Sequence, residues 1–253
     1  MGTETRVRGR LAGRVAIVTG GSRGIGAAIA KRLASEGADV AITYAGSAEA
    51  AESTVAAVRS SGVRATALCA DAADAEAVKA VVPTVVEAFG HLDILVNNAG
   101  IFVMAPLAEC SDEDFERIVA INVRAVFLAS REAARVMGVG GRIISIGSAN
   151  GARVSFPGCS LYAMSKAALT GLTKGWARDL GPRGITVTCV QPGPIETDLN
   201  PATGDLADLL TPGTALGRYG TVDEVAALVA FLASPESANI TGCTLNVDGG
   251  FDA

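Results

Sequence analysis

Histidine is nearly absent from this chain, since His91 is the only one among 253 residues. That scarcity excludes His-rich metal sites and any catalytic relay that needs a second histidine. The five cysteines are scattered and contain no Cys-x-x-Cys pair, so neither a disulfide framework nor a zinc ribbon is expected. We therefore predict no metal site, and we interpret the cysteines as small buried hydrophobic residues.

Long apolar runs and an excess of positive charge are missing as well. Residues 1–14 are polar and basic, but the apolar run that follows them, 15–18, is too short for a signal-peptide core or a membrane span. The formal net charge of -5 argues against a protein that binds the phosphate backbone of nucleic acids. We expect a cytoplasmic protein that binds neither membranes nor nucleic acid.

Short β-branched runs alternate with longer alanine-rich segments of helical period, and this alternation indicates repeated βαβ units. Several of the expected strands are apolar on consecutive residues, as in a parallel sheet that helices cover on both faces. The fold class is therefore α/β, with one domain over residues 1–253. Strands are expected near 14–19, 39–44, 64–69, 93–96, 141–146, 185–190 and 243–247. Helices are expected near 24–36, 48–61, 74–89, 112–137, 160–180 and 222–233.

Residues 193–220 interrupt this alternation. The segment contains three prolines, several glycines and only one short helical candidate, 205–210. A connection of this length inside a compact domain is usually functional, so we interpret it as a lid over a substrate; the alternative is a surface loop without a role.

A glycine-rich loop joins the first expected strand to the first expected helix. Its glycines allow a tight turn, close approach of a phosphate and close packing of helix on strand, and the helix N-terminus favours negative charge. We therefore expect a dinucleotide to bind at this loop. The loop residues of this predicted site are Gly20, Ser22, Arg23, Gly24, Ile25 and Gly26.

The end of the second strand favours NADP(H) over NAD(H). An NAD enzyme keeps an acidic residue there for the ribose 2′-hydroxyl, but this chain has Tyr44, and Asp39 lies at the other end of the strand. Arg23 in the glycine loop and Ser47 before the next helix provide a cation and a hydroxyl for a 2′-phosphate.

Tyr162 and Lys166 are the candidate proton-transfer pair. If 160–180 is helical, their spacing of four residues places them on one face with Cβ atoms roughly 5 to 6 Å apart. The ammonium then favours the ionised form of the phenol, which makes Tyr162 a usable general acid or base. Such a pair is also common on solvated helix faces, so its meaning depends on the motifs around it.

Taken together, the motifs resemble those of the short-chain dehydrogenase/reductase family from about residue 11 to the end of the chain. The resemblance rests on six motifs in order: Thr19-Gly-Gly-Ser-Arg-Gly-Ile-Gly26, Asn97-Asn-Ala-Gly100, Asn122 in Ile-Asn-Val, Ser148, Tyr162 with Lys166, and Pro192-Gly193. It implies a single Rossmann-type, doubly wound sheet of seven parallel strands in the order 3-2-1-4-5-6-7. It also implies a homotetramer, with helices 112–137 and 160–180 at one interface and Gly249–Phe251 at another.

The resemblance implies four catalytic residues. Tyr162 would exchange a proton with the substrate oxygen, and Ser148 would hydrogen-bond that oxygen. Lys166 would bind the nicotinamide ribose and stabilise the tyrosinate, while Asn122 would hold a water that links Lys166 to solvent.

Further cofactor contacts follow from the same resemblance. Asp71 would meet the adenine, and Asn98 and Gly100 would line the ribose region. The carboxamide side of the cofactor site is implied at Pro192, Gly193, Ile195 and Thr197.

The walls of the substrate pocket are expected on the segments that flank the catalytic pair. They are Ala149, Asn150, Val154, Phe156 and Cys159, together with Ile101, Phe102 and the lid after Gly193.

Three functions remain open from the sequence. The first is an NADP(H)-dependent carbonyl reductase or alcohol dehydrogenase for a small or medium ketone, because the expected pocket walls are mostly apolar. The second is a 3-oxoacyl-carrier-protein reductase, for which Arg124 and Arg131 would offer a docking surface. The third is a regulator that binds a cyclic dinucleotide, because residues 191–204 resemble a biofilm-dispersal member of the family.

Overall fold

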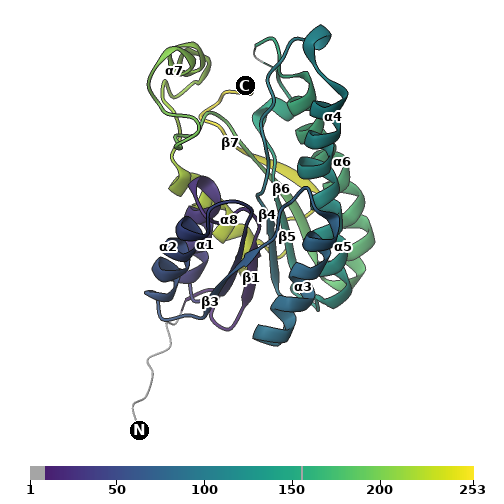
Figure 1. Cartoon of the computed structure of the whole chain (residues 1–253). Coiled ribbons are helices and arrows are strands. Elements are labelled where there is room, and N and C mark those ends of the chain that lie inside the picture. Colours follow the sequence, from purple (N-terminus) through teal and green to yellow (C-terminus); the bar gives the residue numbers. More distant parts are fainter. Residues whose placement is uncertain (1–8, 155) are drawn as a thin grey trace.

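Seven parallel strands form one sheet in the order β3-β2-β1-β4-β5-β6-β7 (Figure 1). This computed structural model describes residues 9–154 and 156–253, so most of the basic N-terminal segment lies outside the described residues. The predicted fold class and strand order are confirmed. The strands are β1 (Val15–Val18), β2 (Asp39–Tyr44), β3 (Ala65–Cys69), β4 (Ile94–Asn97), β5 (Arg142–Ile146), β6 (Thr186–Pro192) and β7 (Cys243–Val247).

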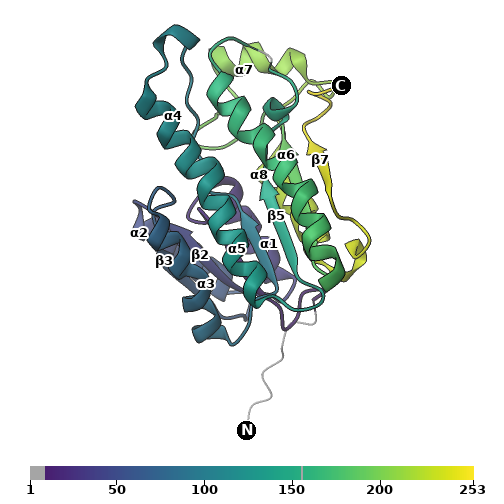
Figure 2. The same cartoon turned by 90° about the vertical axis from the view of Figure 1, so that its right-hand side faces the viewer.

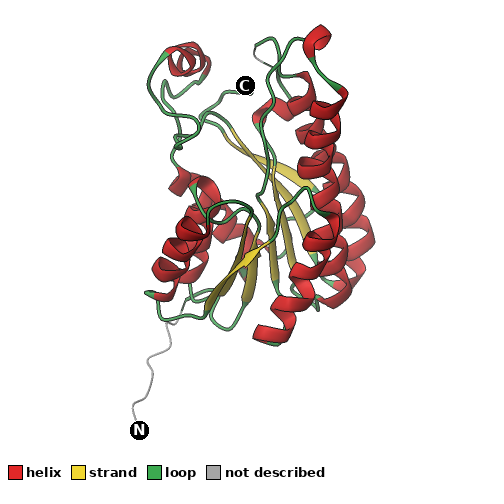
Figure 3. Cartoon of the chain, viewed as in Figure 1, coloured by secondary structure: helices red, strands yellow, loops and turns green. Residues whose placement is uncertain are grey.

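Helices cover both faces of the sheet, which accounts for the consecutive apolar residues in its strands (Figure 3). One layer contains α1 (Gly24–Ser35), α2 (Ala48–Arg59) and α8 (Val222–Ala233). The opposite layer contains α3 (Ala75–Phe89), α5 (Ala125–Val136) and α6 (Ser160–Leu180), and α4 (Asp112–Val119) leads into α5.

Two hydrophobic cores lie between the sheet and its helical layers. Within β1, Ala16 and Val18 point into the core under α1 and α8, while Val15 and Ile17 point into the core under α3 and α5. Because side chains alternate between the faces of a strand, an uninterrupted apolar run fills both cores. Polar side chains that bind a ligand or catalyse a reaction are therefore expected at the ends of the strands.

Local signals set the helix boundaries close to the predicted ones. Asp74 accepts hydrogen bonds from the amides of Glu76 and Ala77, so α3 begins after it rather than at residue 74. Gly90 ends α3 with a φ of 94°, a conformation that favours glycine. Thr221 and Glu224 form a capping box at the start of α8.

The predicted helix over 112–137 is not uniform. A π-helical turn, Ala120–Arg124, separates α4 from α5, although the two run on almost as one rod (Figure 2). The turn contains Asn122, whose buried side chain bonds the backbone of Ile101 and the hydroxyl of Ser165. Periodicity alone does not reveal such an insertion, and π turns are frequent at functional sites.

The segment 193–220 contains α7 (Asp205–Leu210), which matches the predicted short helix, and lies beyond the carboxyl ends of the strands (Figure 1). Most of this segment lies outside the two main cores, although Ile195 near its start packs into the core under α1 and α8. A separate small cluster joins Ala207, Leu210 and Tyr219 to Ala149 and Phe251. No helix in the described part of the chain is both long and apolar enough to cross a membrane.

Candidate active site

The glycine loop between β1 and α1 has a backbone that requires glycine. Gly20 and Gly24 have φ values of 64° and 53°, which strain residues with a Cβ atom. A Cβ atom on Gly26 would overlap the carbonyl oxygen of Gly20 and lie 2.5 Å from Nδ2 of Asn98. The loop therefore presses directly against the start of α1, as a phosphate-binding turn requires.

Side chains that the sequence analysis did not single out hold this loop in place. Thr43 accepts a hydrogen bond from the Gly20 amide through Oγ1 at 3.1 Å, and its carbonyl accepts from the Gly21 amide at 2.9 Å. Thr54 Oγ1 donates to the carbonyl of Ser22 at 3.1 Å. Their strand and helix positions look ordinary in the sequence, so only the folded structure reveals them.

Asn98 supports the same loop from the end of β4. Its Nδ2 donates to the carbonyls of Thr19 and Gly20 at 2.9 and 3.0 Å, while Thr19 Oγ1 accepts from the amides of Asn98 and Ala99 at 2.9 and 3.0 Å. Both hydrogens of the Asn98 side-chain amide thus bond to backbone carbonyls of the protein. Its contribution to the expected ribose region is to fix the carboxyl ends of β1 and β4 relative to one another.

The residues expected near the adenosine lie along one side of the glycine loop. Arg23 is exposed, directly precedes α1 and makes no capping bond to that helix. Ser47 caps α2 by accepting from the Ala50 amide, and exposed Asp71 accepts from the Ala73 amide. Tyr44 ends β2, and its ring packs partly against the core under α1.

The loop after β6 approaches the glycine loop from the other side. A Cβ atom on Gly24 would lie 3.6 Å from Cγ2 of Thr197, so these two segments are neighbours. Gly193 lies where a Cβ atom would be 2.7 Å from Cα of Asp248. The Ile195 side chain is only 4% exposed and packs into the core under α1 and α8. Only its backbone could therefore contact a cofactor.

Lys166 brings a buried ammonium to the carboxyl edge of the sheet. The residue is 6% exposed, and Nζ donates to the carbonyl of Ile146 at 2.9 Å. Nζ lies 5.7 Å from the centre of the Tyr162 ring and 3.5 Å from the position of a Cβ on Gly100. An ammonium has three donors, so this hydrogen bond orients it and leaves two for other partners.

The Asn122 amide is used by the protein itself. Oδ1 accepts from the Ile101 amide at 2.9 Å, and Nδ2 donates to the Ile101 carbonyl and to Ser165 Oγ at 2.9 and 3.0 Å. These bonds attach the π turn to the loop after β4 and to α6. Because both hydrogens of the side-chain amide are occupied, a water held at Asn122 would have to donate a hydrogen bond rather than accept one, and Oδ1 keeps a second lone pair for it.

Ser148 lies just after β5, and a hydrogen bond from a backbone amide orients its hydroxyl. Its Oγ accepts the amide of Asn150 at 3.1 Å, which leaves the hydroxyl proton free for another acceptor. Asn150 Oδ1 is a buried atom without a hydrogen-bond partner among the described residues. This turn therefore offers one free donor and one free acceptor next to the expected substrate position.

One of the expected substrate walls, Phe102, contacts Tyr162: its ring meets the Tyr162 ring edge-on, with centroids 4.9 Å apart. Phe156 packs against the cluster that contains Ala149. Cys159 is buried, and burial raises the pKa of its thiol, which suits an apolar residue better than a nucleophile.

The Phe251 ring of the C-terminal segment is buried within the single chain, at 4% exposure. It packs in the small cluster with Ala207 and Leu210, and its carbonyl accepts from Arg153 at 2.7 Å. The predicted interface at Gly249–Phe251 would therefore use the rest of this segment rather than the Phe251 ring.

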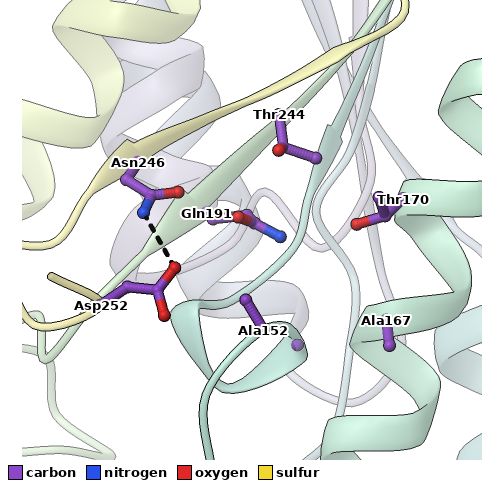
Figure 4. Close-up of a pocket in the computed structure, with 8 residues that line it drawn as sticks. Ala152, Ala167, Thr170, Gln191, Thr244, Asn246 and Asp252 are labelled. Atoms are coloured by element: carbon purple, nitrogen blue, oxygen red, sulfur yellow. Dashed lines mark hydrogen bonds between the residues drawn. The ribbon is translucent and has the colours of Figure 1, made fainter.

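A groove of about 500 Å³ lies behind the Ser148 turn, on the β7 side of α6 (Figure 4). It does not include Tyr162 or the glycine loop. The side chains drawn in it are mostly short and polar, and the Asn246 amide donates to Asp252 across one edge. Its lining residues are Gly151, Ala152, Ala167, Thr170, Gln191, Thr244, Asn246 and Asp252.

Comparison with known proteins identifies the family. A family model described as enoyl-(acyl carrier protein) reductase matches residues 20–252. The chain belongs to the short-chain dehydrogenase/reductase family, as its motifs predicted.

Three relatives illustrate the range of this family. The chain is 48% identical to a cyclic-di-GMP-binding biofilm dispersal mediator protein of Escherichia coli, over 97% of this chain and 100% of that protein. It is 43% identical to a 3-oxoacyl-[acyl-carrier-protein] reductase of Staphylococcus aureus, over 93% and 96% of the two chains. A short-chain dehydrogenase of Burkholderia cenocepacia, crystallised with NADP, is 57% identical, with a TM-score of 0.95 over 96% of this chain and 100% of that one.

Proposed function

We propose that the protein is an NADP(H)-dependent oxidoreductase that interconverts a small or medium ketone and its secondary alcohol. The observation that carries this proposal is the buried ammonium of Lys166, oriented by the Ile146 carbonyl beside the Tyr162 ring and next to Gly100. Burial of an ammonium is costly, and the cost is explained if Lys166 stabilises the Tyr162 phenolate and binds the cofactor ribose.

The residues present fit NADP(H). Gly20 and Gly24 adopt positive φ values at the N-terminus of α1, and Gly26 has no room for a side chain, so backbone amides can approach a pyrophosphate. Exposed Arg23 and Ser47 are available to a 2′-phosphate. The proposed cofactor site consists of Gly20, Ser22, Arg23, Gly24, Ile25, Gly26, Tyr44, Ser47, Asp71, Asn98, Gly100, Tyr162, Lys166, Pro192, Gly193, Ile195 and Thr197.

The chain's own residues handle the substrate oxygen and its proton. When bound, the nicotinamide supplies or accepts the hydride. Ser148 directs its free proton at the oxygen, where negative charge grows during reduction. The Tyr162 hydroxyl donates the proton that completes the alcohol, and Lys166 stabilises the phenolate that remains. Asn122 holds the π turn against the Ile101 loop and α6, which keeps this set together.

Arg23→Ala should separate the two nicotinamide cofactors. We expect the KM for NADPH to rise roughly 10- to 100-fold, because a hydrogen bond to a charged group is lost, while the KM for NADH stays nearly constant. Steady-state kinetics with both cofactors on one ketone measures this. An equal rise for both would show that Arg23 does not read the 2′-phosphate.

Two relatives suggest alternative functions, a carrier-protein reductase and a cyclic-di-GMP-binding regulator. The acyl-carrier hypothesis relied on Arg124 and Arg131, but Arg131 pairs with Glu132 at 2.9 Å and Arg124 donates to the Ala73 carbonyl. A panel of ketones and alcohols should be assayed with NADPH and NADH, and cyclic di-GMP should be titrated by calorimetry. Turnover with NADPH supports the proposal, whereas tight cyclic di-GMP binding without any turnover would reject it in favour of a regulator.

We also infer a homotetramer. Large apolar side chains are exposed on the outer faces of the α4, α5 and α6 helices, where Phe115, Phe127 and Met164 are 42%, 41% and 38% exposed. The second predicted interface, at Gly249–Phe251, borders the groove beside β7, which Asp252 lines. Light scattering should give the mass of four chains, and a monomer would contradict the inference.

A further inference from the structure

Exposed apolar side chains gather on the segments that flank Tyr162. The Phe102 ring, which contacts the Tyr162 ring, is itself 51% exposed. The same loop after β4, the loop after β5 and the segment 193–220 carry further exposed apolar residues. Together they are Phe102, Met104, Leu107, Val154, Leu199, Leu206, Leu209 and Leu216.

These segments are connected around the catalytic pair. The Ala105 amide donates to the Gly158 carbonyl at 3.0 Å, which joins the loop after β4 to the loop after β5. Phe156 in the latter loop packs against the cluster that contains Ala207 and Leu210 of α7. The buried side of α7 thus sits over Ala149, next to Ser148, while Leu206 and Leu209 remain 44% and 61% exposed.

The charges on these segments are mostly negative. Residues 193–217 contain no lysine or arginine, and all four of their carboxylates are exposed: Glu196, Asp198, Asp205 and Asp208. The next cation, Arg218, pairs with Glu224 at 2.6 Å. Glu109 before α4 and three carboxylates in the first turn of α4, Asp112, Glu113 and Asp114, precede the first cation of that helix, Arg117.

The cations near this region are held by the protein itself. Arg153 is the only charged residue in 149–161, and its guanidinium donates to the Phe251 carbonyl at 2.7 Å, while the buried Lys166 ammonium donates to the Ile146 carbonyl. A substrate that enters beside Tyr162 therefore meets apolar side chains within a rim of negative charge.

We propose that the substrate is an uncharged ketone with an extended apolar substituent, which lies between Phe102 and the α7 leucines Leu206 and Leu209. This inference rests on the proposed ketone reduction and names its substrate class. Apolar contact favours the substituent, because each buried methylene contributes roughly fourfold to binding. The acidic rim disfavours anionic substrates, which include coenzyme A thioesters, carrier-protein thioesters and cyclic dinucleotides.

A chain-length series tests the apolar contact. With NADPH, kcat/KM should rise roughly two- to fourfold for each methylene from 2-butanone to 2-octanone. The double variant L206S/L209S should flatten this rise, because the apolar contact that each added methylene makes is removed. Val139→Ser is the matched control, because Val139 is 87% exposed and lies on the turn before β5, at the opposite edge of the sheet. A flat series in the unaltered protein, or an unchanged slope in L206S/L209S, would overturn the inference.

Two thioesters of one 3-oxoacyl group test the charge. At low salt the neutral N-acetylcysteamine thioester should exceed the coenzyme A thioester in kcat/KM by about tenfold, and added salt should narrow the gap. D205N/D208N should narrow it as well, with the KM for NADPH unchanged. Preference for the coenzyme A thioester would reject this inference about the substrate and leave the proposed ketone reduction intact. If no ketone is reduced at all, the proposed function fails first, so the two failures are distinguishable.

Discussion

Tyr162→Phe should reduce kcat for ketone reduction by about 10³-fold, within the range found for a positioned general acid. The substitution removes one hydroxyl and keeps the ring that Phe102 contacts edge-on, so the fold and the pocket wall should persist. Dissociation constants for NADPH, measured by fluorescence titration, should change less than about threefold, because Lys166 keeps its hydrogen bond to the Ile146 carbonyl.

Tyr219→Phe is the matched control for this variant. The Tyr219 hydroxyl is buried and no well-aligned hydrogen bond reaches it from the described residues, and burial raises its pKa although the nearby Asn200 side chain opposes the rise. Removing it should therefore leave both kcat and thermal stability nearly unchanged. If Tyr162→Phe instead abolished NADPH binding, or if both variants lost the same activity, Tyr162 would be a structural residue.

Gly26→Val should abolish tight NADPH binding and destabilise the protein. Even a Cβ atom at this position would overlap the Gly20 carbonyl and lie 2.5 Å from Asn98 Nδ2, so the loop or α1 must move. Overpacking of this kind costs about 1 to 3 kcal/mol of unfolding free energy. A displaced loop also moves the backbone amides away from the pyrophosphate, so NADPH affinity should fall sharply.

The comparison needs a glycine without such neighbours. A Cβ atom on Gly138 would meet nothing within 4 Å, so Gly138→Ala should leave NADPH affinity and the melting temperature essentially unchanged. Calorimetric titration and thermal unfolding of both variants measure the difference. A Gly26→Val protein that binds NADPH like the unaltered protein would disprove close packing of the loop against α1.

The regular parts of this protein follow from local patterns in the sequence. Residues 39–44, 160–180 and 222–233 form the expected elements with the expected bounds, because hydrophobic period and capping residues such as Thr221 act over a few neighbours. The strand order came from family resemblance rather than from any local pattern. Parallel pairing brings distant segments together, and no short stretch specifies it.

The supporting contacts of the site were beyond sequence reasoning. Thr43 and Thr54 look like ordinary strand and helix residues, yet they hold the glycine loop through hydrogen bonds across the fold. The π turn at Asn122 was missed for a similar reason, because its hydrogen bonds to Ile101 and Ser165 form only after tertiary packing. The contact of Phe251 with α7 could not be predicted either, because the two segments lie far apart along the chain.

The small cluster under α7 makes the two sides of the site mechanically unequal. The glycine loop is built on the main cores, whereas α7 rests on a few contacts with Ala149, Tyr219 and Phe251. Detaching α7 would expose only the side chains of this cluster, so the free energy of such a local opening should be far below that of global unfolding. Under the proposed function, substrate and product would pass beneath α7 while the cofactor stays bound, and this opening would set the pace of turnover.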